Sequence, residues 1–308
     1  MNKISNRQTI CEVLLEKAKD DKDIVVVCSD SRGSASLTPF FNTYPEQSVE
    51  VGIAEQNLVG VSAGLASCGK KVYCASPASF LPTRSYEQAK VDVAYSNTNV
   101  KMIGISGGVS YGALGMTHHS CQDFAAMCGL TGMRVYDPSD RFQTRKLIEA
   151  LYEDEKPAYI RVSRNPGEDV YDENMSFTLN KANVLGKGKD VLLVSCGELV
   201  PYAKKAMDTL NEKGISTGLI DMYCIKPYDE ETLLEYAKDV KLVVSIEEHG
   251  PNGGLGAKTA QVLCHNMPKK LVEINLPDEH LISGTNHEMF TYYGLDDQGI
   301  VKTVLENL

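Results

Sequence analysis

The sequence predicts an α/β fold made of two consecutive doubly wound domains with mostly parallel sheets. Three observations support this prediction. Apolar runs of strand length alternate with segments of helical periodicity along the chain. The 308 residues are enough for two domains that each bury a core. The alternation is lost once, where Gly, Pro, Asn, Asp and Lys gather between residues 165 and 189.

The first domain is expected to span residues 1–168. Its strands are predicted from apolar runs, and its helices from apolar residues three or four positions apart. In order, the expected elements are a helix around Ile10–Ala18, a strand at Ile24–Cys28, a helix from Glu55 to Ser67, a strand at Lys71–Ala75, a helix from Arg84 to Ala94, a strand at Val100–Ser106, a helix from Cys121 to Cys128, a helix after Asp140 and a strand at Ala158–Val162.

Residues 169–189 are expected to be a linker, because their composition favours turns over regular structure. The second domain is expected over residues 190–308, where the alternation of strands and helices resumes. Its expected strands are Asp190–Cys196, Ile215–Met222, Lys241–Ile246 and Lys270–Ile274, with helices through Ala203 and Leu210, through Leu233 and Tyr236, and after Gly256.

The composition excludes several classes of protein. With 43% hydrophobic and 23% charged residues, the chain is neither disordered nor fibrous. A net charge of −10 argues against general nucleic-acid binding, although a local basic pocket for a small anion remains possible. No apolar stretch is long enough for a membrane span, and no signal peptide is evident. The nine cysteines are scattered singly and are expected to be reduced core residues, so we expect a cytoplasmic protein.

Two short motifs have competing interpretations. The segment from Gly64 to Lys71 resembles a phosphate-binding loop, but it closes a helix and lacks the final hydroxyl residue, so a helix-ending glycine explains it better. His118-His119-Ser120-Cys121 lacks the companions of a transition-metal site, and no metal site is predicted there. Because a glycine-rich segment precedes this histidine pair, a substrate-handling loop is favoured over a polar surface.

Glu55 is the strongest single candidate for chemistry. It ends an apolar run and begins a helix rich in alanine and glycine. A carboxylate at that place can stabilise the helix dipole, or it can be a desolvated acid or base. The residue alone does not decide between these roles.

Four motifs in order give the sequence its resemblance to a known family. They are Ile53-Ala54-Glu55-Gln56-Asn57, the pair Phe80 and Tyr86, Gly115-Met116-Thr117-His118, and Glu247-Glu248-His249 followed by Gly253-Gly254-Leu255-Gly256. Over essentially its whole length the chain resembles the C-terminal half of thiamine-diphosphate-dependent transketolases. The resemblance implies a pyrimidine-binding domain of the thiamine-diphosphate-binding fold, followed by a transketolase C-terminal domain.

The resemblance implies transfer of a two-carbon ketol unit from a ketose to an aldose. Glu55 matches the glutamate that hydrogen-bonds a nitrogen of the cofactor's aminopyrimidine. This hydrogen bond helps the aminopyrimidine to take the C2 proton of the thiazolium. Phe80 and Tyr86 match the aromatic walls of the pyrimidine site, although ordinary core packing remains the alternative for both. Glu55 and His118 are therefore the predicted catalytic residues, and Glu55, Phe80 and Tyr86 are the predicted cofactor-binding residues.

The resemblance also implies a substrate channel for a phosphorylated or otherwise acidic sugar. Its predicted residues are Arg7, Asp30, Ser34, His118 and Arg164. Arginine forks suit a terminal phosphate, although single arginines are more often surface charges. This chain has Leu114 and Ser106 where the family commonly has an aspartate and a histidine. These two departures predict an unusual donor sugar or a different anionic end.

The family's magnesium-binding motif, Gly-Asp-Gly followed by a downstream asparagine, is absent from the sequence. The resemblance therefore implies that Mg²⁺ and the diphosphate of thiamine diphosphate are held by a separate N-terminal subunit. The chain is expected to be inactive alone and to assemble as a heterotetramer with two copies of each subunit. Three alternatives stay open: the β subunit of a 2-oxoacid dehydrogenase E1 component, half of a 1-deoxyxylulose-phosphate synthase, and a non-catalytic subunit of the same fold.

Overall fold

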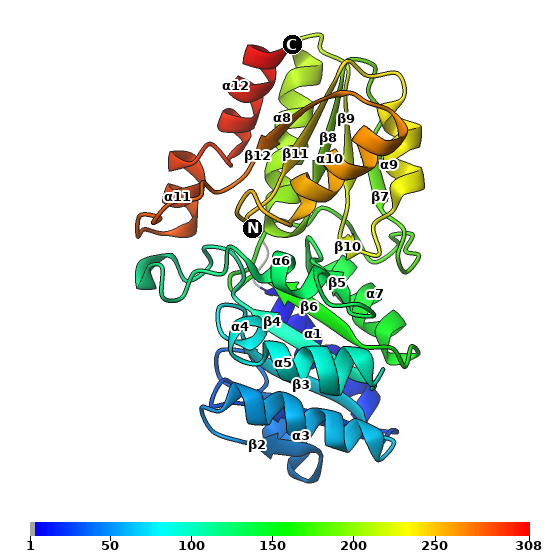
Figure 1. Ribbon diagram of the computed structural model, residues 1–308, viewed down its shortest axis with the longest axis vertical. Helices are drawn as coiled ribbons and strands as arrows, with labels where there is room; N and C mark the ends of the chain where they lie inside the picture. Colours follow the sequence, from blue (N-terminus) through cyan, green and yellow to red (C-terminus); the bar gives the residue numbers. More distant parts are fainter. Residues whose placement is uncertain (1–3) are drawn as a thin grey trace.

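The computed structural model describes residues 4–308, which form two α/β units stacked along the long axis of the molecule (Figure 1). The elements of the first unit are α1 (Asn6–Ala18), β1 (Ile24–Cys28), α2 (Thr38–Thr43), β2 (Ser48–Glu50), α3 (Glu55–Ser67), β3 (Lys71–Pro77), α4 (Leu81–Arg84), α5 (Tyr86–Gln88), a π-helix (Ala89–Tyr95), β4 (Val100–Ile105), α6 (Asp123–Cys128), β5 (Arg134–Tyr136), α7 (Arg141–Tyr152) and β6 (Ala158–Val162). Those of the second are β7 (Asn183–Gly186), β8 (Val191–Ser195), α8 (Val200–Glu212), β9 (Thr217–Asp221), β10 (Cys224–Lys226), α9 (Glu230–Ala237), β11 (Leu242–Ile246), α10 (Leu255–Asn266), β12 (Lys270–Ile274), α11 (Asn286–Tyr292) and α12 (Asp297–Asn307).

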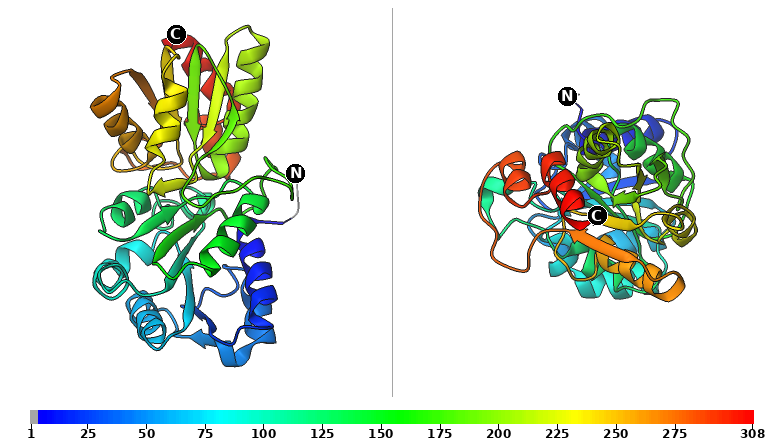
Figure 2. Two further views of the ribbon diagram at one scale, coloured as in Figure 1. Left: turned by 90° about the vertical axis from the view of Figure 1, so that its right-hand side faces the viewer. Right: turned by 90° about the horizontal axis from the view of Figure 1, so that it is seen from above.

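The first sheet has seven strands in the order β10-β5-β6-β4-β3-β1-β2, and all neighbours are parallel except β10 and β5. Every residue of β1, β4 and β6 is buried, as expected for a parallel sheet covered on both faces. Helices α1 and α7 pack together on one face, and α3, α4, α5 and the π-helix cover the other (Figure 2). The predicted α/β architecture is confirmed here.

The second sheet has the order β12-β11-β8-β9-β7 and is parallel except at its β7 edge. Alternate residues of β8 face opposite sides of this sheet. Val191 and Leu193 join the core beneath α8 and α12, whereas Leu192 and Val194 join a larger core that continues into the first unit. One face of the second sheet is therefore continuous with the apolar core of the first unit, and the other face has a core of its own.

Four strands, β2, β5, β7 and β10, are absent from the expectations of the sequence, and the last two of these have a clear physical reason. The predicted linker at residues 169–189 contains β7, an edge strand whose asparagine and glycine conceal its pairing with β9. Strand β10 comes from the second half of the sequence but pairs antiparallel with β5 of the first sheet. Three residues before a proline carry no periodicity, so only tertiary pairing reveals this strand.

Two further differences concern a helix and the cysteines. The single helix expected from Arg84 to Ala94 is divided into the end of α4, the short α5 and the π-helix. Cys68 and Cys264 are exposed, although core positions were expected for the cysteines. All nine cysteines are free.

A buried charge cluster joins the two units. The Arg161 guanidinium, which is almost fully buried, donates to the backbone carbonyl of Glu248 at 2.7 Å. It also contacts carboxylate oxygens of Glu248 and Asp123, each at 3.4 Å. The amide of Val109 donates to Glu248 Oε1 at 2.6 Å. These contacts fasten the loop after β4 to the second unit.

The adjacent Glu247 stabilises the start of a helix of the second unit. Its carboxylate accepts hydrogen bonds from the amides of Leu255 and Gly256 at 2.7 and 2.8 Å, which caps the N-terminus of α10. Burial raises the pKa of Glu247 to about 7, against the opposing effect of these two amides. The motif at Glu247-Glu248-His249 is thus structural.

No helix within residues 4–308 has the length and apolar character needed to cross a bilayer.

Candidate active site

The predicted site residues come from loops at the carboxyl ends of adjacent parallel strands, where ligand sites of open α/β sheets form. The positions are Asp30 and Ser34 after β1, Glu55 after β2, Phe80 after β3, His118 in the loop after β4 and Arg164 after β6, with Arg7 at the start of α1. The sheet order places β6, β4, β3, β1 and β2 side by side. Residues far apart in the sequence therefore meet at one edge.

Glu55 is the first residue of α3 and only 6% of it is exposed. Both roles proposed for it from the sequence are compatible with this position, because the carboxylate is buried and lies in the first helical turn. Glu50 holds the turn that leads into α3. Its Oε1 accepts from the amide of Asp30 at 2.6 Å and from the amide of Gly52 at 3.1 Å. Gly52 has a φ of +72°, which glycine adopts without strain.

The Glu55 carboxylate has a cationic partner. Nη1 of Arg84 donates to Glu55 Oε1 at 2.8 Å. The Arg84 guanidinium also lies over the ring of Phe80, with Cζ 4.0 Å from the ring centroid. An open depression in the surface is lined by residues 53–57 and Arg84.

His118 lies between two aromatic rings. Its imidazole meets Phe80 and Tyr111 edge to face, with centroid separations of 5.2 and 5.6 Å. Nδ1 of His118 is 2.9 Å from the hydroxyl of Thr117, so Nε2 is left for another partner. The neighbouring His119 is buried, and burial lowers its pKa. Its Nδ1 has no hydrogen-bond partner within the described part of the chain.

Arg7 and Arg164 form the opposite end of the site. Arg7 donates through Nε to the backbone carbonyl of Arg164 at 2.8 Å and through Nη1 to the backbone carbonyl of Ser34. The Arg164 guanidinium lies over the ring of Tyr111 at 4.8 Å. Burial and the positive charge of Arg164 lower the pKa of Arg7.

Together these contacts make one continuous path through the site. It runs from Glu55 to Arg84, Phe80, His118, Tyr111, Arg164, Arg7 and Ser34. Six of the eight predicted site residues lie on this path. Arg84 and Tyr111, which were not predicted, connect them. Their only signal in the sequence is their place inside the aromatic and glycine-rich motifs that hold Phe80 and His118.

Asp30 and Tyr86 are outside this path. The Asp30 side chain is exposed and its φ is +55°. Among residues 4–308, its amide is the group that is engaged, by Glu50. Tyr86 begins α5 and is 38% exposed. No ring contact within residues 4–308 joins it to Phe80.

The two positions that depart from the family pattern differ in exposure. Leu114 is 54% exposed in a 3-10 turn that precedes Gly115. Ser106 is fully buried with a φ of +59°, and its hydroxyl has no partner among the residues described.

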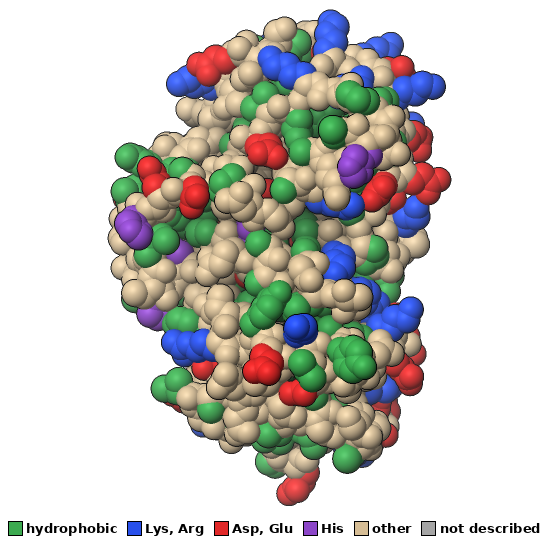
Figure 3. Space-filling model, in the orientation of Figure 1, with side chains coloured by type: hydrophobic (Ala, Val, Ile, Leu, Met, Phe, Trp, Pro, Cys, Tyr) green, Lys and Arg blue, Asp and Glu red, His purple; other side chains and the backbone are tan. Residues whose placement is uncertain are grey.

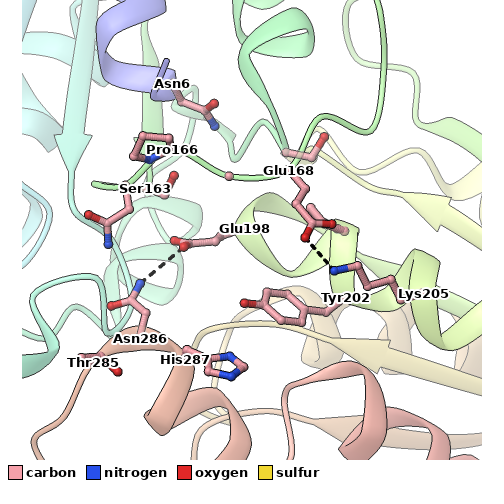
Figure 4. A pocket seen from close by; sticks show the side chains of 14 residues that line it. Asn6, Ser163, Pro166, Glu168, Glu198, Tyr202, Lys205, Thr285, Asn286 and His287 are labelled. Atoms are coloured by element: carbon pink, nitrogen blue, oxygen red, sulfur yellow. Dashed lines mark hydrogen bonds and ion pairs between the residues drawn. The ribbon is translucent and has the colours of Figure 1, made fainter. Parts of the chain in front are cut away.

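A separate cavity of about 280 Å³ lies between the two units (Figure 4). Glu198 and Asn286 point toward each other across it, with Oε1 and Nδ2 3.4 Å apart, and Lys205 pairs with Glu168 at 2.7 Å. Burial raises the pKa of Glu198 to about 7. This cavity shares no lining residue with the depression beside Glu55.

Two further features of the described residues are the charges on their surface and their candidate metal-ligating side chains. Acidic and basic side chains are intermixed on the face shown in Figure 3. Within residues 4–308 no group of three or more His, Cys, Asp or Glu side chains is arranged to hold a metal ion.

Comparison with family models gives two matches that follow each other along the chain. Residues 2–168 match the transketolase pyrimidine-binding domain, and residues 180–300 match the transketolase C-terminal domain. The chain is 47% identical to a subunit of the apulose-4-phosphate transketolase of Phocaeicola vulgatus over 306 residues, which cover 99% of this chain and 98% of that protein. It is 34% identical to a 6-deoxy-6-sulfo-D-fructose transketolase subunit from Clostridium sp. over 300 residues, covering 97% of this chain and 93% of that subunit.

Comparison with solved structures gives the same result. A structure described as a split-gene transketolase in an inactive β4 tetramer superposes with a TM-score of 0.90 at 32% sequence identity. The match covers 98% of each chain.

Proposed function

Because the chain belongs to the transketolase family, we propose that it acts as the C-terminal subunit of a split transketolase. Such an enzyme transfers a two-carbon ketol unit from a ketose to an aldose with the help of thiamine diphosphate. The observation that carries the proposal is the continuous path from Glu55 to Arg7. It has a buried acid and an aromatic ring at one end and two arginines at the other.

The residues at the first end fit the pyrimidine ring of thiamine diphosphate. When bound, this cofactor supplies the nucleophilic carbon that attacks the ketose carbonyl. We assign Glu55 to hold a proton on a pyrimidine nitrogen, because its side chain is buried and Glu55 lines an open depression. Phe80 offers a ring face for stacking. Tyr86, which is 38% exposed, is assigned to the same pyrimidine site.

The opposite end fits an anionic group of the substrate. Arg7 and Arg164 have no carboxylate partner within residues 4–308, and the hydroxyl of Ser34 is also unengaged there. Arg7 donates two hydrogen bonds to the backbone carbonyls of Ser34 and Arg164, so its main role is to position these residues. Arg164 and Ser34 then bind the phosphate or another acidic end directly. Asp30, exposed at the end of β1, is assigned to the sugar channel.

His118 lies between the two ends and is assigned to the reacting oxygen of the substrate. With Nδ1 beside the Thr117 hydroxyl, Nε2 is the nitrogen that can donate to a developing alkoxide. Phe80 and Tyr111 fix the ring plane on both sides. Leu114, exposed in the same loop, offers an apolar contact where the family pattern has an acid, so the donor sugar is expected to lack the hydroxyl that such an acid would bind.

A partner subunit completes this proposal. The sequence lacks the Gly-Asp-Gly motif, so Mg²⁺ and the diphosphate are assigned to an N-terminal transketolase subunit, and the assembly is proposed to contain two copies of each chain. The relatives named as subunits and as a split-gene enzyme support a two-chain organisation.

The test combines this chain with an N-terminal transketolase subunit, thiamine diphosphate and Mg²⁺. Two-carbon transfer from a ketose phosphate to an aldose phosphate is expected, and neither subunit alone should show it. A parallel reaction with a sulfonated ketose separates phosphate from sulfonate recognition. Decarboxylation of pyruvate in place of ketol transfer would assign the chain to the 2-oxoacid dehydrogenase class, and no reaction with either substrate class would support a non-catalytic subunit.

A further inference from the structure

Arg84 contacts both residues that the proposed function assigns to the pyrimidine. It donates to Glu55 Oε1 at 2.8 Å, and its Cζ lies 4.0 Å from the centroid of Phe80. We infer that Arg84 is a placeholder: its guanidinium occupies the pyrimidine site until thiamine diphosphate arrives, and it must leave for the cofactor to bind. This inference rests on the proposed function, because it takes Glu55 and Phe80 as the cofactor's contacts.

The chemistry of the guanidinium supports this role. It is flat and positively charged, and it presents N–H donors along one edge while its face stacks on aromatic rings. An aminopyrimidine protonated on its ring nitrogen offers the same combination of a flat face and a donor edge. The two groups therefore satisfy Glu55 Oε1 and the same face of Phe80 in the same way, so they compete for these contacts.

Exposure shows which member of the ion pair is free to move. The Arg84 side chain is 47% exposed, whereas Glu55 is 6% exposed. Arg84 is the last residue of the four-residue helix α4. Within residues 4–308, the bond to Glu55 Oε1 is the only hydrogen bond that the Arg84 side chain makes to another side chain. The long side chain of Arg84 can rotate into solvent. The buried contacts that it would break are those with Glu55 and Phe80.

The placeholder has two consequences for the subunit. Without cofactor, it keeps a buried carboxylate paired, which avoids the cost of an isolated charge. When cofactor is added, the Arg84 guanidinium competes with it for Glu55 and Phe80. The apparent affinity for the cofactor then equals the intrinsic affinity multiplied by the fraction of molecules in which Arg84 has left these contacts. A half-exposed ion pair is weak, so this competition is worth about fivefold in the dissociation constant.

The test uses the complete two-subunit complex and calorimetric titration with thiamine diphosphate at constant Mg²⁺. Arg84→Ala should bind about fivefold more tightly than the natural sequence. Arg84→Lys keeps the charge but cannot stack as a plane, so its affinity should lie between the two. The matched control is Arg145→Ala, which removes a similar pair with Glu16 at 2.8 Å on the remote helix α7 and should leave the affinity unchanged.

Three outcomes separate this inference from the proposed function. Unchanged or weaker binding by Arg84→Ala, in a complex whose natural form binds the cofactor, overturns the placeholder alone. A natural complex that binds no thiamine diphosphate overturns the proposed function as well. If Arg84→Ala fails to assemble, Arg84→Lys decides, because binding no tighter than that of the natural complex also overturns the inference.

Discussion

Nε of Arg7 donates to the backbone carbonyl of Arg164 at 2.8 Å, which brings two arginines together at one end of the site. Neither guanidinium pairs with a carboxylate anywhere in residues 4–308. Their mutual repulsion contributes to the lowered pKa of Arg7, after burial. An anionic group between them would relieve this repulsion, so the pair supports the proposed recognition of an anionic end.

Arg164→Ala should weaken recognition of the anionic end of the substrate. A charge-assisted hydrogen bond is worth about 2 kcal/mol, which corresponds to a loss of roughly thirtyfold in kcat/KM for a phosphorylated ketose. Steady-state kinetics with the phosphorylated ketose and its unphosphorylated form measures the effect. The unphosphorylated form should lose little, and an equal loss for both sugars would assign Arg164 to general structure.

Glu55→Gln should abolish most of the turnover while leaving the fold intact. Glutamine has nearly the same shape but cannot hold the negative charge that stabilises a protonated ring nitrogen. Loss of a positioned acid or base of this kind reduces rates by roughly 10²–10⁴-fold. Initial rates of ketol transfer by the complex, together with thermal melting of the variant, measure the two effects. A variant with normal rates would contradict the role assigned to Glu55.

Asp221→Asn should change how stability depends on pH. Burial raises the pKa of Asp221 to about 7, although hydrogen bonds from Tyr171, Ser139 and Gln143 oppose the shift. Because the folded chain holds this proton more tightly than the unfolded chain, stability falls as the pH rises from about 4 to about 7. The variant cannot ionise, so between pH 5 and pH 8 its stability should improve relative to the natural chain by roughly 2–4 kcal/mol.

Urea unfolding of both proteins at pH 5 and pH 8, at one protein concentration, measures this change. The informative quantity is the difference between variant and natural chain at each pH, since other buried carboxyls also titrate. An identical difference at both values would show that Asp221 ionises normally in the folded chain.

Gly108→Ala should destabilise the junction between the two units. Gly108 has a φ of +57°, and an added Cβ would lie 2.1 Å from Cδ of Glu248. The Glu248 side chain would have to leave its bond with Val109 and its contact with Arg161, a loss of about 3 kcal/mol or more. Thermal unfolding of the variant and of the natural chain measures this loss of stability. Gly33→Ala is the control, since nothing lies within 4 Å of its added Cβ, and a similar loss in both would refute the explanation.

Local patterns predict the parts of the fold whose stability is local. Helix α3 begins at Glu55 and ends at Ser67, as expected from its apolar spacing, and β1 and β6 match the predicted runs. Both strands are buried on two faces, so their sequences are continuously apolar. The order of the site loops then follows from the parallel arrangement of the strands.

Pairings between distant segments could not be predicted in this way. Strand β10 is defined by its hydrogen bonds to β5, because three residues before a proline have no periodicity. The contacts of Arg84 and Tyr111 depend on side chains that cross between loops, and Arg7 binds backbone carbonyls, which any sequence supplies. The motif at Glu247-Glu248-His249 marks the family, and its contacts lie at the start of α10 and at the junction between the two units.

The position of β10 also limits how this polypeptide can be divided. Removal of everything after residue 189 would strip β5 of its antiparallel neighbour and leave its backbone groups as an open edge that invites aggregation. The truncated first half would also lose Glu248 and leave the Arg161 guanidinium with only Asp123 as its carboxylate contact. Protein engineers who want to fuse a reporter or exchange modules should therefore keep both units of the chain together.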